Sequence, residues 1–560
     1  MSDMKSARRA HPDVILTGGT VITMDDDRRR VESLWLHGDR IASAGTFAEV
    51  EAQAPREARR VDLAGATVLP GFVDAHCHVG ALAFALGTVD CSPEAAPSMT
   101  GLLAAIHEAA RAAAAAPAGQ WVVGHSFAEN AVAERRFPTR QELDSAVPDR
   151  PAVVFHRSLH ACIVNSRGLA AAGLDLADDP PFGKLGRDAH GQPDGTVYEA
   201  PMFDLFARLA GEALAAMTTE GRIRAVARAA ELFVAQGVTT AMDADLPGIG
   251  WLKAMMEADA AGRLPLRLSA LINDRDATWA LQAGILGGRS LDRFRLGGVK
   301  VFADGGMSSR TAAVHREFTL PPYGRGVLFR DNDALTDLVR RAEASGAQVG
   351  VHAQGDRAIE TVLDAFEAVI GTGGVAGNGL RHRIEHGGML LPRLIERASR
   401  IGIHVVSQPG FFTPLGDGWL RGYGEQAHAF YPFRSIREAG LRLGGSSDAP
   451  VITPNVREAL RDAVLRETAA GVVLGERERL TIEDALEMYT RDAAYLSRAD
   501  DLVGTLEAGK YADLVILDGD PTKLDARALP GIAVLQTVVG GEPVFGDGPI
   551  GPARPGRVAA

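Results

Sequence analysis

Residues Gly71-Phe72-Val73-Asp74-Ala75-His76-Cys77-His78 form an apolar run that ends in two histidines separated by one residue. Side chains at positions i and i+2 of an extended strand point to the same face, so His76 and His78 can direct both imidazoles at one metal ion. The pair alone is a weak signal, because neutral histidines also fill protein cores. The first hypothesis is a metal-dependent hydrolase.

Four later strand candidates also end in residues that can bind a metal or carry a proton. They are Val299-Lys300-Val301-Phe302, Val349-Gly350-Val351-His352, Arg383-Ile384-Glu385-His386 and Leu443-Gly444-Gly445-Ser446-Ser447-Asp448. The carboxyl ends of parallel strands meet at one face of a barrel, which is where barrel active sites lie. Further strand candidates at 68–76, 239–245, 266–273 and 404–408 bring the total to eight. The sequence therefore predicts an α/β fold with a (β/α)8 barrel.

The two ends of the chain contain strand-rich segments that cannot bury a face on their own. We expect residues 1–69 and 501–548 to form the two parts of one small β-sandwich, with the barrel spanning 70–500. Residues 79–237 are far too long for an ordinary connection after the first strand, so they are expected to form an inserted lid or pocket wall, including Phe155 as a specificity residue. Residues 549–560 are expected to be a loose tail.

Composition excludes several classes of protein. The 560 residues are 46% hydrophobic and 23% charged, which is ordinary for a globular enzyme, and the net charge of −12 argues against a nucleic-acid partner. The sequence contains no uninterrupted apolar window of about 18 residues, so no membrane span is expected. The three cysteines, Cys77, Cys91 and Cys162, lack disulfide spacing, which favours a reduced, cytoplasmic protein. Alternation along the strand predicts that Cys77 points away from the metal.

Longer motifs resemble the amidohydrolase superfamily, and within it the YtcJ-like branch that includes N-substituted formamide deformylases. The matching stretches are VLPGFVDAHCHV, FPTRQELDSAVPDRPAVVFHRSLHACIVNSRGLAAAGL, GGVKVFADGGMSSRTA, VHAQGDRAI, RHRIEHGG, GGSSDAPVITPN and LEAGKYADLVILDGDP. Together they extend from about residue 13 to 547. The resemblance implies the barrel, the terminal sandwich and a metal site.

By this resemblance, His76 and His78 hold one metal, and His352 and His386 hold a second. Lys300 would be carboxylated by carbon dioxide, and the resulting carbamate would bridge both metals. A bare Lys300 could instead pair with Asp304. Zinc suits imidazole and oxygen ligands, although iron, manganese or cobalt could occupy the same site.

Asp448 is predicted to join the metal site and to carry a proton from the attacking hydroxide to the leaving nitrogen. The alternative role is that of a turn or helix-capping aspartate before proline. His160 matches a histidine in the family's lid and is either a substrate contact or a hydrogen-bonded core residue. Asp304 and Arg310 follow Lys300 and could touch substrate or pair with each other.

His382 competes with the predicted ligands, because it lies four residues before His386. On a continuous strand it would share the face of His386 but lie deeper in the barrel, where it would pack in the core or support a metal ligand from behind.

The function predicted from these residues is hydrolysis of a non-peptide carbon–nitrogen bond, in an N-formyl or N-acyl amide of a small molecule, by metal-activated hydroxide. The alternatives are a deaminase or cyclic-amide hydrolase, against which Lys300 weighs, and a lyase or isomerase on the same barrel. A non-enzymatic protein with a dead site would have lost a ligand, whereas all six positions are present. The sequence leaves open whether the protein forms a homodimer.

Overall fold

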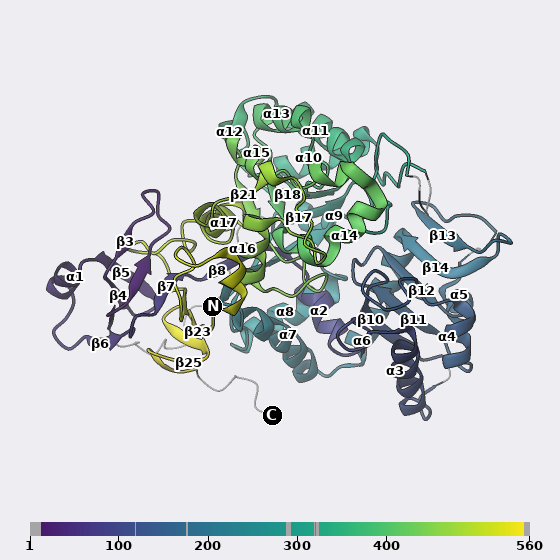
Figure 1. Ribbon diagram of the computed structural model, residues 1–560, viewed down its shortest axis with the longest axis horizontal. Helices are drawn as coiled ribbons and strands as arrows, with labels where there is room; N and C mark the ends of the chain where they lie inside the picture. Colours follow the sequence, from purple (N-terminus) through teal and green to yellow (C-terminus); the bar gives the residue numbers. More distant parts are fainter. Residues whose placement is uncertain are drawn as a thin grey trace.

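A computed structural model describes residues 13–117, 119–174, 177–286, 293–318, 320 and 324–553. Eight parallel strands make its central sheet, and consecutive strands are hydrogen-bonded neighbours (Figure 1). In order they are β8 (Phe72–Cys77), β15 (Val238–Asp243), β16 (Arg267–Asn273), β17 (Phe294–Phe302), β18 (Gln348–Ala353), β19 (Arg383–His386), β20 (His404–Ser407) and β21 (Leu443–Gly445). The amide of Asp448 donates to the carbonyl of His76 across 2.8 Å, which links the two outer strands. The predicted barrel is confirmed.

Helices surround these strands, and their apolar faces explain their position. In α11 (Asp356–Ile370), Ile359, Val362, Leu363 and Phe366 are buried at helical spacing. Other helices in the barrel part of the chain are α2 (Val79–Ala85), α7 (Thr219–Val234), α8 (Ile249–Ala260), α9 (Asp274–Gln282), α10 (Asn332–Ala344), α12 (Gly374–Gly377), α13 (Pro392–Ile401), α14 (Phe412–Tyr423), α15 (Phe433–Glu438), α16 (Val456–Leu465), α17 (Ile482–Met488) and α18 (Arg491–Leu496). Among the described residues, no helix is long and apolar enough to cross a bilayer.

The first predicted strand, 68–76, is divided in two by the structure. Residues Thr67–Pro70 form β7 in a terminal sheet, and only Phe72–Cys77 belong to the barrel. The break falls at Gly71, whose amide donates to Asp513 and where a Cβ atom would lie 2.2 Å from the side chain of Thr239. A close approach of barrel strand β15 therefore requires glycine at this junction.

Strands from both ends of the chain share one terminal sheet, in the order β24-β23-β22-β7-β2-β3. Beside it lies a second sheet, β5-β4-β1-β6, and one hydrophobic core contains Leu16, Leu34, Val68 and Leu514. The bounds are β1 (Val14–Thr17), β2 (Thr20–Ile22), β3 (Arg30–Val31), β4 (Ser33–His37), β5 (Arg40–Gly45), α1 (Phe47–Gln53), β6 (Arg59–Asp62), β22 (Leu514–Leu517), β23 (Val534–Val539) and β24 (Glu542–Phe545).

Residues 549–553 were predicted to belong to a loose tail, but the structure packs them against the terminal sheets. Here β26 (Gly551–Pro552) pairs with β25 (Asp547–Gly548), and Ile550 is buried in the terminal core. Residues 554–560 lie outside the described residues.

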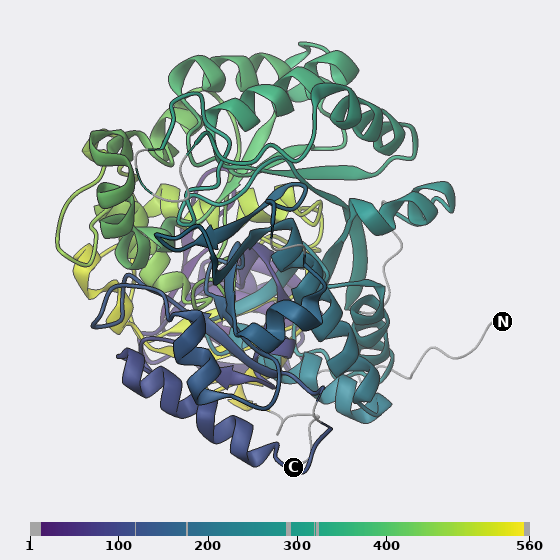
Figure 2. The ribbon, with the colours of Figure 1, turned by 90° about the vertical axis from the view of Figure 1, so that its right-hand side faces the viewer.

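The long segment after β8 builds a sheet of its own, in the order β13-β14-β12-β11-β10-β9. Figure 2 looks onto this segment, which lies in front of the barrel. Its elements are β9 (Val89–Asp90), α3 (Met99–Ala112), β10 (Val122–Phe127), α4 (Arg140–Ala146), β11 (Ala152–His156), β12 (Ala161–Val164), α5 (Ser166–Ala172), β13 (Gly183–Arg187), β14 (Pro193–Glu199) and α6 (Ala200–Ala216). Helix α7, also within 79–237, instead packs against α8 and α2, so it belongs to the helical layer of the barrel.

Candidate metal centre

The six residues predicted for the metal site gather at one end of the barrel. His76 and His78 lie at the end of β8, Lys300 in β17, His352 in β18, His386 at the end of β19, and Asp448 in the loop after β21. Nε2 of His78 lies 2.9 Å and Nε2 of His76 lies 3.4 Å from Oδ1 of Asp448. The His386 ring centroid lies 4.7 Å from that of His76 and 4.6 Å from that of His352.

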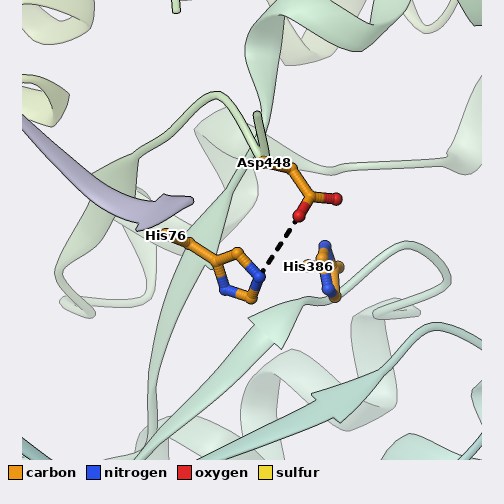
Figure 3. A group of neighbouring side chains, drawn as sticks. All are labelled: His76, His386 and Asp448. Carbon is orange, nitrogen blue, oxygen red and sulfur yellow. Dashed lines mark ion pairs between the residues drawn. The ribbon is translucent and has the colours of Figure 1, made fainter. Parts of the chain in front are cut away.

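Three of these residues present donor atoms to a common point. One ligand atom from each of His76, His386 and Asp448 lies within 4.8 Å of the others (Figure 3). The backbone at His386 has φ +73°, which is uncommon for a residue with a side chain. Because this turn interrupts the alternation of β19, Glu385 and His386 both face the site although they are adjacent.

Hydrogen bonds fix the orientation of the three innermost imidazoles. Nδ1 of His76 lies 2.7 Å from Glu385, Nδ1 of His386 lies 2.9 Å from the Gln408 side-chain oxygen, and Nε2 of His352 lies 3.2 Å from the carbonyl of Gly305. Metal-ligating histidines characteristically use one ring nitrogen in this way and keep the other for the ion. Nε2 of His76 is buried and, apart from its 3.4 Å approach to Oδ1 of Asp448, has no polar partner within the described chain, as expected of an atom that faces a ligand.

Burial also keeps two of these rings, those of His352 and His386, in the form that binds metal. Burial and the neighbouring His76 lower the pKa of His386 to about 3, and burial together with His386 places the pKa of His352 well below its usual value. Both imidazoles are therefore neutral at neutral pH, as metal ligation requires.

Lys300 is wholly buried, and its amine has no hydrogen-bond partner among the described residues. Nζ lies 4.7 Å from the centroid of the Phe302 ring. Burial lowers the pKa of this amine, although the charges of Glu385, Asp245 and Asp448 partly oppose the shift. A buried polar group without a hydrogen-bond partner is costly, so the position favours a modification or a ligand that satisfies the amine.

The amidohydrolase family model matches residues 59–545. The chain belongs to the amidohydrolase family. It is 32% identical over 542 residues to an N-substituted formamide deformylase of Arthrobacter pascens, covering 94% of this chain and 97% of that protein. It is 29% identical to the putative amidohydrolase YtcJ of Bacillus subtilis (strain 168), covering 94% and 98% of the two chains.

Among solved structures, an uncharacterized metal-dependent hydrolase from Pyrococcus horikoshii OT3 is 25% identical and superposes with a TM-score of 0.71, covering 92% of this chain and 99% of that one. These matches confirm the resemblance inferred from the motifs. This amidohydrolase is a metal-dependent hydrolase that acts on carbon–nitrogen bonds.

Sequence reasoning missed Glu385, which the barrel places behind His76. Its Oε2 contacts His76 and its Oε1 accepts a 2.7 Å hydrogen bond from Arg383. Burial alone would raise the pKa of Glu385, but Arg383 and His76 outweigh it and hold that pKa far below the usual range. One signal in the sequence could have indicated this role. Glu385 is a charged residue inside a short strand, β19, that leads directly to a predicted metal ligand.

Replacing Glu385 with glutamine is expected to weaken metal binding about 10- to 100-fold, because His76 loses the carboxylate that orients it. Titration of the apoprotein with zinc against a chelator of known affinity measures the effect. Glu343→Gln is the matched control, since Glu343 contacts His382 at 2.7 Å outside the site. Equal zinc affinity in the Glu385 variant and the wild type would rule out this role.

His382 does not share the face of His386, so that prediction was wrong. It precedes β19, stacks on Phe366 of α11 with centroids 5.5 Å apart, and contacts Glu343 of α10. His382 does pack in the protein interior, but it packs against helices α10 and α11 and not inside the barrel.

Cys77 is buried away from the site, where its thiol donates to the carbonyl of Met242.

The loop residues predicted to touch substrate take different positions. Asp304 is buried and accepts backbone hydrogen bonds from Ala313, Gln354 and Gly355, while burial raises its pKa to about 7. Asp304 and Arg310 do not line the cavity above the six residues, whereas His160 does. Asp304 therefore organises the loop around the site, and its contact with substrate, like that of Arg310, stays a prediction.

A cavity of about 360 Å³ opens over the six residues, five of which line it. Phenylalanines line it, Phe203 and Phe206 in the inserted segment and Phe302 and Phe329 in the barrel, together with polar and charged side chains that include Asp274, Arg275 and Arg330. Phe182, which is 55% exposed, also lines it. Phe155, expected as a specificity residue, is instead buried behind Phe206, with ring centroids 5.1 Å apart. Sequence reasoning missed Phe203.

Proposed function

We propose that this protein hydrolyses an N-formyl or other N-acyl amide of a small molecule at a centre of two divalent metal ions, with zinc as the natural occupant. The observation that carries the proposal is the grouping of the neutral imidazoles of His352 and His386 with the His76 ring held by Glu385, around one buried lysine whose amine has no hydrogen-bond partner among the described residues. The similarity to a protein named N-substituted formamide deformylase supports the choice of bond.

The donor set suits the metals proposed. His76 and His78 would hold one ion, His352 and His386 the other, and imidazole with oxygen ligands is a combination that zinc accepts. When bound, such ions lower the pKa of water and polarise a carbonyl group.

Lys300 would supply the bridge as a carbamate. A neutral lysine amine adds to carbon dioxide with loss of one proton, which gives an anion with two oxygens in place of an uncharged nitrogen. The lowered pKa of buried Lys300 favours the neutral amine that this addition needs.

Asp448 would move the protons of the reaction. Burial opposes ionisation of Asp448, yet the contacts of its carboxylate with His76 and His78 outweigh it and hold the pKa of Asp448 well below its usual value. The group is thus a carboxylate that lines the cavity and can accept a proton from water and deliver it to the leaving nitrogen.

The phenylalanines that line the cavity would contact the substituent on the amide. Phe203→Ala should raise KM about tenfold for substrates with a bulky apolar substituent, because it removes apolar contact worth about 1.4 kcal/mol, and should leave metal content unchanged. Kinetics with bulky and small substrates measure the change, and Phe155→Leu serves as a core control. A uniform loss across both substrates would argue against a pocket role.

A substrate panel tests the proposal directly. Zinc-loaded protein is offered formamides, acylated amines, lactams and aminated heterocycles, and release of carboxylic acid, amine and ammonia is measured. Amide turnover that disappears in His386→Ala is the expected result. Ammonia release from a heterocycle without amide turnover would assign a deaminase instead, and turnover of lactams alone a cyclic-amide hydrolase.

A further inference from the structure

A buried histidine–carboxylate pair stands beside the proposed metal site. Oε2 of Glu199 lies 2.8 Å from Nδ1 of His160. The other carboxylate oxygen accepts hydrogen bonds from the Thr311 hydroxyl and from the amide of Gly306, in the loop after β17. Glu199 is completely buried, so every one of these contacts is shielded from water.

The backbone of Glu199 is held in a rare conformation, with φ +63° and ψ −131° at the junction of β14 and α6. The hydrogen bonds from Thr311 and Gly306 would be sufficient if Glu199 only attached the inserted segment to the loop after β17. The second carboxylate oxygen contacts only the His160 ring within the described residues. Glu199 therefore orients the His160 ring in addition to attaching the inserted segment to the loop after β17.

The His160 ring is clamped at the cavity wall. Its centroid lies 5.2 Å from that of His352 and 5.4 Å from that of Phe203. On another side is Gly306, where a Cβ atom would lie 2.9 Å from the ring. His160 lines the cavity, and no hydrogen bond to its Nε2 occurs within the described part of the chain.

The partner of Nδ1 decides which ring nitrogen carries the proton. A carboxylate can only accept, so Nδ1–H of His160 donates to Glu199, and the tautomer of the neutral ring that this contact selects carries its lone pair on Nε2. Nε2 is thus a hydrogen-bond acceptor at the cavity.

We propose that Nε2 of His160 accepts a hydrogen bond from the N–H of the scissile amide, and that Glu199 is the positioning residue that fixes this tautomer. The inference rests on the proposed amide hydrolysis and narrows its substrates to secondary amides. A tertiary amide has no N–H, and its additional alkyl group would meet the acceptor. His160 is then a specificity-determining residue.

The test compares kcat/KM for a secondary N-alkylformamide and its N-methyl tertiary counterpart on zinc-loaded protein. Wild-type protein should prefer the secondary amide. In His160→Leu, kcat/KM for the secondary amide should fall about tenfold, the worth of one hydrogen bond, while that for the tertiary amide changes little. Metal content and melting temperature are measured for each variant, so that unfolding is recognised.

Glu199→Gln probes the tautomer without removing bulk. The glutamine oxygen can still accept from Thr311 and Gly306, whereas its amide donates to Nδ1 and shifts the ring proton to Nε2. The preference for secondary amides should fall as in His160→Leu. The double variant should lose no more than His160→Leu alone, because Glu199 acts through the ring.

Glu129→Gln is the matched control. Glu129 forms an ion pair of 2.8 Å with His156 in the same inserted segment, both residues are buried, and neither lines the active-site cavity. This variant should keep the wild-type ratio. Equal loss on both substrates in His160→Leu, or additive losses in the double variant, would overturn the inference. Turnover of no amide at all by wild-type protein would instead contradict the proposed function.

Discussion

Lys300→Ala is expected to lose the metal and to reduce turnover to background. A cationic lysine beside two divalent ions would be strongly repelled, and a neutral amine offers one nitrogen at most. A carbamate supplies an anion with two oxygens at the position where the buried amine has no partner within the described residues. Elemental analysis and amide turnover measure the two losses.

Short carboxylic acids at high concentration should restore part of the metal content and activity of Lys300→Ala by occupying the vacated bridge. Lys253→Ala is the control, because the side chain of Lys253 is exposed on α8 and forms only a surface ion pair with Glu257. Electron density with an unmodified Lys300 beside a fully occupied, active metal site would overturn the bridged model and favour a mononuclear hydrolase.

Asp448→Asn is expected to keep the metal but to lose about 10²- to 10⁴-fold in kcat, the usual contribution of a general acid–base group. Asparagine preserves the size of the side chain and removes its basicity. Steady-state rates of amide hydrolysis, together with elemental analysis of metal content, measure the effect. Single-turnover experiments on the same variant separate chemistry from product release.

Asp243→Asn is the control for Asp448→Asn. Asp243 is a completely buried carboxylate on β15 that accepts a 2.8 Å hydrogen bond from the amide of Gly80, and burial raises its pKa to about 6. It does not line the cavity, so its variant should retain most turnover. Near-normal kcat in Asp448→Asn would assign proton transfer to another group.

The sequence alone was sufficient for the barrel, and it also named six residues that the structure brings to one end of that barrel, where their binding of metal stays a prediction. The barrel and the shared face of His76 and His78 follow from local periodicity, because a strand repeats every two residues, whereas the full ligand set came from the resemblance to the amidohydrolase superfamily. The same periodicity misplaced His382, because the left-handed backbone at His386 turns that residue toward the site against the alternation of β19.

Only the tertiary structure revealed Glu385 and Glu199, the two carboxylates that orient the predicted residues His76 and His160. Glu385 lies 309 positions from His76 along the chain, and Glu199 contacts both His160 and Thr311, which is 112 positions away. The division of the first strand at Gly71 likewise depends on Asp513 and Thr239. Spacing along a chain specifies which side chains share a face, whereas hydrogen bonds between distant segments exist only after the strands have packed, so orientation and protonation at this site were decided by the fold.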